Sequence, residues 1–228
     1  MSIFAPARTV LIAMCLVTSG AMAFTLADIS NADAASGLKA ALEKGSVAAV
    51  GKLGIANGFL NNEQVRIKLP PILEQARPLL QMTGRGQQLD ELVVAMNHAA
   101  EAAVPMAKPL LLNAVKSMSV TDAKQILTGG DTSVTNFFRN KTSAELAMKF
   151  LPIVKGVTDR SDLSGKYNSV MGQVSRLGLS QQLSVEEYVT QRALDGLFKV
   201  IGDEEKAIRS DPLGSGSKII GKVFSAVR

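Results

Sequence analysis

The sequence predicts a mainly α-helical fold: a single multi-helix domain with at most one short hairpin or extended segment near residues 58–69. Apolar residues recur at steps of three and four through most of the chain after residue 30, which is the period of helices packed on a core. Only residues 65–69 clearly alternate with the period of a strand. No low-complexity linker or convincing repeat divides the chain.

Residues 1–23 have the features of a secretory signal peptide. Arg8 supplies a positive charge, residues 10–17 form an apolar run, and Ala21-Met22-Ala23 is an A-x-A cleavage site. The run is shorter than the about 20 residues that span a bilayer. Cys15 lies within the run and follows Met14 rather than a small residue, which disfavours lipidation. We therefore expect a periplasmic protein, cleaved after Ala23, with one all-α domain over residues 24–228.

The composition of the predicted mature chain excludes several chemistries. The single cysteine is Cys15, so residues 24–228 contain no disulfide, thiol nucleophile or thiolate metal ligand. The formal charge of +5 and pI near 9.4 are compatible with contact with anionic lipid, envelope polysaccharide or an acidic protein. The charges are scattered without a long basic run. We expect no nucleic-acid partner, no metal and no cofactor.

The first third of the chain is expected to contain two helices separated by irregular chain. A helix follows an N-cap at Asn31 and extends to about Lys52, and residues 54–62 form a loop. Residues 65–69 either pair with residues 58–60 as a small hairpin or simply lie extended, because a lone strand has no hydrogen-bond partner. A short helix follows over residues 71–82.

Residues 87–118 carry the longest apolar stripe and are expected to form the central helix, with the other helices around it. Pro105 and Pro109 lie inside the pattern, and each removes a backbone donor. A kink or break is therefore expected near Val104. The opposite, polar face is expected to carry Glu91, His98, Glu101 and Lys116.

The remaining helices are expected to begin at polar N-caps and to end at glycine or proline. Pro152 lies inside one of them. The expected starts are Ser119 or Thr121, Asp131 or Thr132, Thr142 or Ser143, Ser161 or Asp162, Ser184, and a point shortly before Ile219.

His98 is the only histidine and, with its neighbour Asn97, is a candidate for binding a ligand or a proton. The alternative is a solvated histidine near the carboxylate of Glu101. A catalytic zinc site is hard to assemble without a second histidine or a cysteine, and no G-x-S-x-G motif occurs. No catalytic residue is assigned, and the sequence favours a non-catalytic protein.

A second candidate is an anion site at Gly129, Gly130 and Asp131, which precede a predicted helix. Free backbone N–H groups at a helix start bind anions, and Arg139 follows two turns later. The alternative is a glycine stop followed by an Asp N-cap, and the charge of Asp131 would repel an anion.

Two surfaces are candidates for interaction. The last helix places Phe224 on an apolar face and Lys218 and Lys222 opposite it, so that it either lies on an anionic membrane or docks on the core. Arg66 and Lys68 lie on one side of the extended segment, which is either an edge for a partner or a lid over the core.

Several motifs lie in residues 33–42, 58–62, 65–70, 96–105, 126–131 and 211–218. Together they resemble the bacterial family called domain of unknown function 4197, over roughly residues 28–224. The resemblance implies an exported, mainly helical protein and supplies no functional residues. The family's extended segment often reads Ile-Pro-Leu-Pro, whereas Lys68 stands at the first of these prolines.

Three functions remain open. The first is an exported non-catalytic protein of the cell envelope that binds an apolar or lipid-like ligand in a cavity. The alternative is a protein- or membrane-surface interaction module that uses the basic amphipathic C-terminal helix. The third is an enzyme of unknown class.

Overall fold

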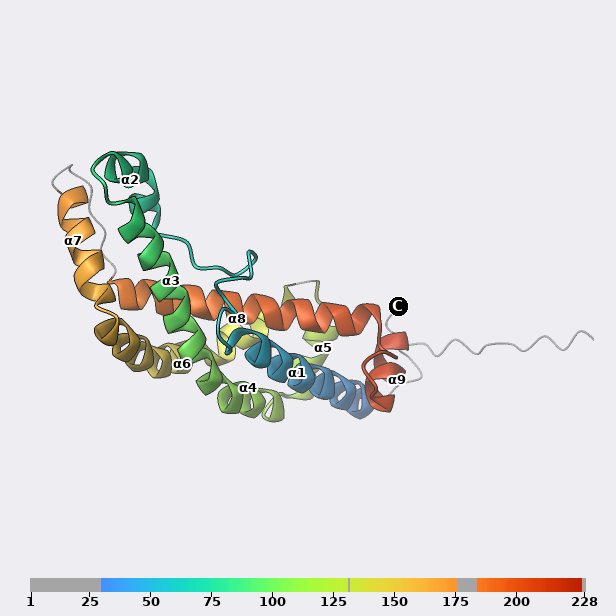
Figure 1. Cartoon of the computed structure of the whole chain (residues 1–228). Helices are drawn as coiled ribbons and strands as arrows, with labels where there is room; N and C mark the ends of the chain where they lie inside the picture. Colours follow the sequence, from blue (N-terminus) through green and yellow to red (C-terminus); the bar gives the residue numbers. More distant parts are fainter. Residues whose placement is uncertain (1–29, 131, 176–183, 227–228) are drawn as a thin grey trace, which may run out of the picture.

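The computed structural model of the chain describes residues 30–130, 132–175 and 184–226; the predicted signal peptide and Asp131 lie outside this part. The described residues form a mainly α-helical domain around one apolar core (Figure 1), and no strand occurs among them. The helices are α1 (Asn31–Leu53), α2 (Pro71–Met82), α3 (Gly86–Ala103), the 3-10 turn η2 (Val104–Met106), α4 (Ala107–Lys116), α5 (Val120–Thr128), α6 (Ser133–Arg160), α7 (Leu163–Ser175), α8 (Val185–Ser210) and α9 (Lys218–Ala226).

Most helix ends lie where capping chemistry predicts them. Ser119 and Ser184 each begin a helix with a capping box, in which the serine and the acidic residue three positions later satisfy each other's backbone N–H groups. The first helix has its N-cap at Ser30, one residue before the expected Asn31. The expected break near Val104 is confirmed, since α3 gives way to η2 where Pro105 lacks an N–H group.

Residues 133–160 form one helix of 28 residues, so the prediction of two helices divided near Thr142 is wrong. The Thr142 side chain is buried, and its hydroxyl donates to the Phe138 carbonyl at 2.7 Å inside the helix. A threonine that bonds back in this way belongs to a helix interior and leaves the chain without an N-cap there. Pro152 lies inside the same helix, as expected.

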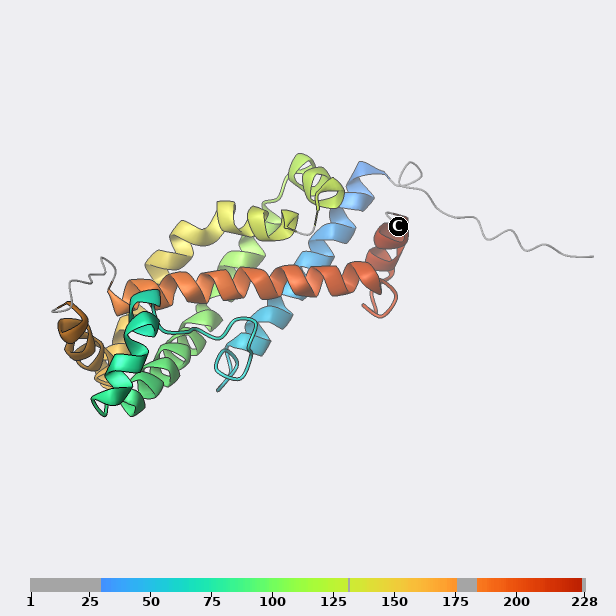
Figure 2. The same cartoon turned by 90° about the horizontal axis from the view of Figure 1, so that it is seen from above.

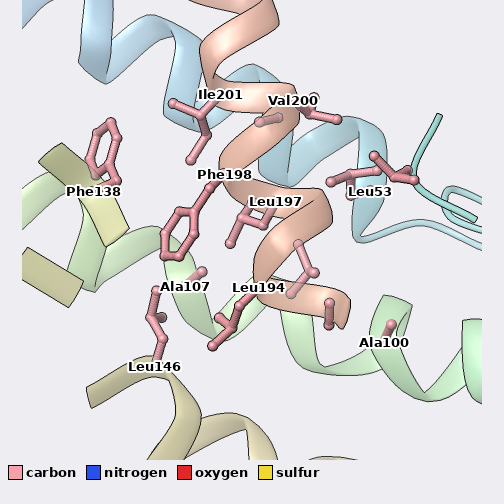
Figure 3. Packing of buried hydrophobic residues seen from close by; sticks show 14 of the residues in the cluster. Leu53, Ala100, Ala107, Phe138, Leu146, Leu194, Leu197, Phe198, Val200 and Ile201 are labelled. Atoms are coloured by element: carbon pink, nitrogen blue, oxygen red, sulfur yellow. The ribbon is translucent and has the colours of Figure 1, made fainter. Parts of the chain in front are cut away.

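Helix α8 shares the central role that was expected for residues 87–118 alone. It packs against α1, α3, α6 and α7, while α3 packs against α2, α6, α7 and α8 (Figure 2). Figure 3 shows Leu197, Phe198 and Ile201 of α8 among side chains of the neighbouring helices, including Phe138 and Leu146 of α6. All five are almost completely buried, so α8 is fixed along one side by dense apolar contacts.

Helix α9 docks on α1, which is one of the two arrangements that its sequence allowed. Its residues Ile220, Val223 and Phe224 are buried, and Lys222 forms an ion pair with Asp33 of α1 at 3.0 Å. Gly37 lets the helices approach closely, since a Cβ built there would lie 2.4 Å from Val223 Cγ2. The apolar face of α9 is therefore part of the core.

This contact predicts opposite effects of the same substitution at two positions of α1. Gly37→Ala should lower the free energy of unfolding by about 1–2 kcal/mol, because the overpacking against Val223 outweighs the gain in helix propensity. Gly51 has no atom within 4 Å of a built Cβ, and Gly51→Ala should raise stability by about 0.5 kcal/mol. Urea unfolding of both variants measures the difference. A stabilised Gly37→Ala protein would contradict the docked position of α9.

Within residues 30–226, as far as they are described, no helix is both long and apolar enough to cross a bilayer.

Candidate functional site: a basic groove beside helix α8

The loop after α1 is held by a buried carboxylate on α3. Glu101 is 6% exposed, and its two oxygens accept the backbone N–H groups of Asn57, Phe59 and Leu60 at 3.0–3.1 Å. The expectation that Glu101 lies on the polar face of its helix is wrong, because the loop folds over that turn of α3 and covers the carboxylate. His98, Glu91 and Lys116 do reach the surface.

Residues 65–69 lie extended against α3 through a second buried polar side chain. Asn97 is completely buried. Its amide oxygen accepts the Ile67 N–H at 2.8 Å, and its amide nitrogen donates to the Ile67 carbonyl at 2.9 Å and to the Val93 carbonyl at 2.7 Å. One side chain thus supplies the hydrogen bonds that a neighbouring strand would supply, and the hairpin with residues 58–60 does not form.

The extended segment presents its charges outward. Val65, Ile67 and Leu69 are buried, whereas Arg66 and Lys68 are exposed. Side chains two residues apart on an extended chain point the same way, about 6–7 Å apart. The backbone anchors therefore fix two parallel cations on the surface.

Helix α8 forms the other wall of a groove next to this segment. The Tyr188 hydroxyl donates to the Lys68 carbonyl at 3.0 Å. A Cβ at Gly196 would lie 2.8 Å from Phe59 Cε1 and 3.1 Å from Val65 Cβ, so only glycine permits this approach. The groove encloses about 320 Å³ and is lined by residues 64–68 together with Tyr188, Arg192, Asp195, Gly196 and Lys199 of α8.

The charge of the groove is positive, and part of it is unneutralised. On α8, Asp195 pairs with Arg192 at 3.1 Å, and Lys199 pairs with Asp203 at 2.7 Å. Arg66 and Lys68 form no ion pair with any described residue. An anion entering the groove would meet these two cations without breaking an ion pair, although Glu74 of α2 lies near enough to interact with the charge of Lys68.

Tyr188 adds a fixed donor and an aromatic surface to the groove. Burial raises the pKa of its hydroxyl, which keeps the proton that it donates to the Lys68 carbonyl. The Arg192 guanidinium lies 5.8 Å from the centre of the Tyr188 ring, within the range of a cation–π contact. Tyr188 thus links α8 to the extended segment, which are the two walls of the groove.

A second, more apolar groove lies between α3, α6 and α7. It encloses about 470 Å³; its lining includes Val94, Ala95 and Val157, and Val94 is 38% exposed. The Glu91–Lys166 ion pair at 2.8 Å crosses its rim, and a hydrogen bond from Lys166 lowers the pKa of Glu91. This surface can accept an apolar group beside a charged pair.

The structure separates the residues predicted as ligand or anion sites. His98 lies on the rim of the apolar groove, with its Nε2 3.3 Å from Asn57 Oδ1, whereas Asn97 points inward. Within the described part of the chain, no group of three or more His, Cys, Asp or Glu side chains is arranged to hold a metal.

The glycine turn before α6 is filled by the protein itself. A Cβ at Gly129 would lie 2.5 Å from Ser133 Cβ, and the Ser133 N–H bonds to the Gly130 carbonyl at 3.0 Å. Asp131, which the sequence placed at the same site, lies outside the described residues. Arg139 pairs with Asp195 of α8 at 2.8 Å, so its charge is directed toward α8.

The predicted interaction residues of the last helix are not brought together on the surface. Phe224 is completely buried and lies 5.6 Å from the Arg209 guanidinium, so its inclusion among the surface residues is corrected. Lys222 is held by Asp33, and Lys218 is exposed at the start of α9.

Sequence reasoning found Arg66 and Lys68 but missed the α8 wall of the groove. The signal was present, because Tyr188, Arg192, Asp195 and Lys199 follow one another at steps of four, three and four, which places them on one helix face. Gly196 inside a long helical pattern was a second signal, since such a glycine often marks a close approach.

Comparison with known proteins adds one match. Searches of curated proteins and of solved structures found no match. The model of a family described as "Protein of unknown function (DUF4197)" matches residues 28–225, nearly all of the chain after the predicted signal peptide. The chain therefore belongs to the DUF4197 family.

Proposed function

We propose that the chain is an exported, non-catalytic binding protein of the bacterial cell envelope, and that the basic groove between residues 64–68 and α8 recognises an anionic partner. The signal-peptide features of residues 1–23 support the periplasmic location. The observation that carries the proposal is the pair Arg66 and Lys68, exposed without ion-pair partners among the described residues on a segment fixed by buried side chains.

The way in which the hydrogen bonds of the extended segment are satisfied supports a binding role. An extended segment without a neighbouring strand needs substitutes for its hydrogen bonds, and here buried Asn97 supplies them at Ile67, while buried Glu101 holds the preceding loop. Buried polar side chains stabilise a fold only when all their bonds are made. Their use here fixes the two cations in place, which reduces the ordering entropy lost on binding.

Charge reversal tests the proposal. Arg66→Glu/Lys68→Glu should weaken binding to anionic probes at least about tenfold at low salt, because attraction becomes repulsion. The probes are poly-L-glutamate, sodium polyphosphate and vesicles containing phosphatidylglycerol, measured by co-sedimentation or fluorescence anisotropy. The matched control is Lys108→Glu/Lys124→Glu, which changes the net charge equally at exposed positions of α4 and α5. Equal losses in both variants, or no binding of any probe, would contradict the proposal.

A lipid-like ligand in the groove between α3, α6 and α7 is a second candidate function. Its support is the exposure of Val94 next to Ala95 and Val157 in a groove of about 470 Å³, since ligand sites are mostly apolar with a few placed polar groups. Native mass spectrometry of protein purified from its own periplasm, with solvent extraction, tests this candidate. A stoichiometric lipid would support it, and clean protein without lipid would count against it.

A further inference from the structure

The extended segment has one edge occupied and one edge partly open. On an extended chain, the N–H and C=O of one residue point to one edge, and those of its neighbours point to the other. Ile67 uses both groups on Asn97. On the opposite edge, the Arg66 N–H bonds to Asn62 and the Lys68 carbonyl accepts from Tyr188. The Arg66 carbonyl and the Lys68 N–H have no hydrogen-bond partner among the described residues.

These two open groups form the pattern that one residue of a parallel strand satisfies. In a parallel ladder, a residue donates its N–H to the carbonyl of residue i and accepts from the N–H of residue i+2. Here i is Arg66 and i+2 is Lys68. The basic groove of about 320 Å³ is lined by this segment, and an added chain would lie there.

We propose that the anionic partner is an extended acidic polypeptide segment that adds to residues 66–68 as a short parallel strand. This inference rests on the proposed function of the groove and names the partner. Strand addition supplies main-chain hydrogen bonds for affinity and alternating side chains for specificity. A peptide offers both, whereas a phosphate group offers charge and hydrogen-bond acceptors but no N–H donor for the Arg66 carbonyl and no alternating side chains.

The direction of the side chains specifies the peptide further. The bridging residue lies level with Ile67 and points toward the same buried side, so it is apolar. The residues before and after it lie beside Arg66 and Lys68 and point outward, where acidic side chains form cross-strand charge pairs. The structure therefore assigns an acidic–apolar–acidic sequence, such as Glu-Val-Glu, to the bound segment.

Two variants at Lys68 distinguish the contribution of its backbone N–H to peptide binding from that of its side-chain charge. Lys68→Ala removes the charge and keeps the N–H, whereas Lys68→Pro removes both. Proline at this position removes no hydrogen bond within the described chain, because the Lys68 N–H has no partner there, and the preceding residue Ile67 is extended, as a residue before proline prefers. Circular dichroism and thermal unfolding test whether both variants retain the fold.

The measurement is fluorescence anisotropy of the purified protein with the labelled peptide Gly-Glu-Val-Glu-Gly. The controls are its isomer Gly-Glu-Glu-Val-Gly and the peptide with N-methylvaline, which lacks the donor for the Arg66 carbonyl. Lys68→Pro should bind about fivefold or more weakly than Lys68→Ala, as expected for the loss of one hydrogen bond. The isomer and the N-methyl peptide should bind the parent protein more weakly by a similar factor.

Four outcomes overturn the inference. Equal affinity of Lys68→Pro and Lys68→Ala, or of the peptide and its isomer, excludes strand addition. Binding of phosphatidylglycerol vesicles without peptide binding, when it depends on Arg66 and Lys68, excludes a peptide partner and leaves the proposed function standing. Failure of every anionic probe overturns both proposals.

Discussion

Replacing Glu101 with alanine is expected to lower the free energy of unfolding by about 3–5 kcal/mol. The substitution leaves the N–H groups of Asn57, Phe59 and Leu60 without their acceptor, and the bond to Phe59 is buried beneath a carboxylate that is itself 6% exposed. It also removes the contact that holds the loop after α1 onto α3. Chemical denaturation measures the loss.

A graded series distinguishes this role from a general effect of losing a glutamate. Glu101→Gln keeps one oxygen for Phe59 and Leu60 and loses only the bond to Asn57, so we expect a smaller loss of about 1–2 kcal/mol. Glu145 is exposed on α6 and has only a 4.0 Å contact with Lys149, and Glu145→Ala should change stability by less than about 0.5 kcal/mol. Similar losses for Glu101→Ala and Glu145→Ala would refute the anchoring role of Glu101.

Replacing Asn97 with alanine is expected to cost about 2–4 kcal/mol and to release residues 65–69 locally. The change leaves the Ile67 N–H and carbonyl unpaired against α3, and each unsatisfied buried group costs about 1–3 kcal/mol. Limited trypsin digestion reports the release, because the enzyme cuts after Arg66 and Lys68. Cleavage there should be faster by tenfold or more, whereas the helical circular dichroism should be retained.

Asn113 provides the matched control for this prediction. It lies exposed on α4, and Asn113→Ala should leave both stability and the trypsin pattern unchanged within about 0.5 kcal/mol. If Asn97→Ala protein resists trypsin at Arg66 and Lys68 as well as the parent does, the segment is fixed by something other than the Asn97 amide.

The fold was predictable where local chemistry determines it. The helical spacing of apolar residues and the capping residues predicted α1, α2, α5 and α8 almost to the residue. Pro105 predicted the break after α3. The single helix over residues 133–160 was not predictable in this way, because Thr142 looks like an N-cap in the sequence. Whether its hydroxyl caps a helix or bonds back to Phe138 depends on its burial by other helices, which is a property of the tertiary structure.

Local sequence pattern predicted the exposed charges of the candidate site but not the buried side chains that hold them, because burial depends on the tertiary structure. Alternation along residues 65–69 placed Arg66 and Lys68 on one side, and they are exposed. The polar residues that hold the segment were misassigned, since Glu101 was placed on the polar face and Asn97 was considered as a ligand-binding residue. Local pattern cannot show that a distant loop covers a helix face, and it therefore cannot show which polar side chains become buried anchors.

The most direct test of the central claim, that the groove beside α8 is the recognition surface, is an amide NMR titration of the protein with Gly-Glu-Val-Glu-Gly. We expect the largest shift changes at Lys68 and Ile67 and on α8 near Tyr188 and Arg192, with the Lys68 amide moving downfield as it gains a hydrogen bond. Changes confined to α9, or to Val94 and Val157 in the apolar groove, would contradict it.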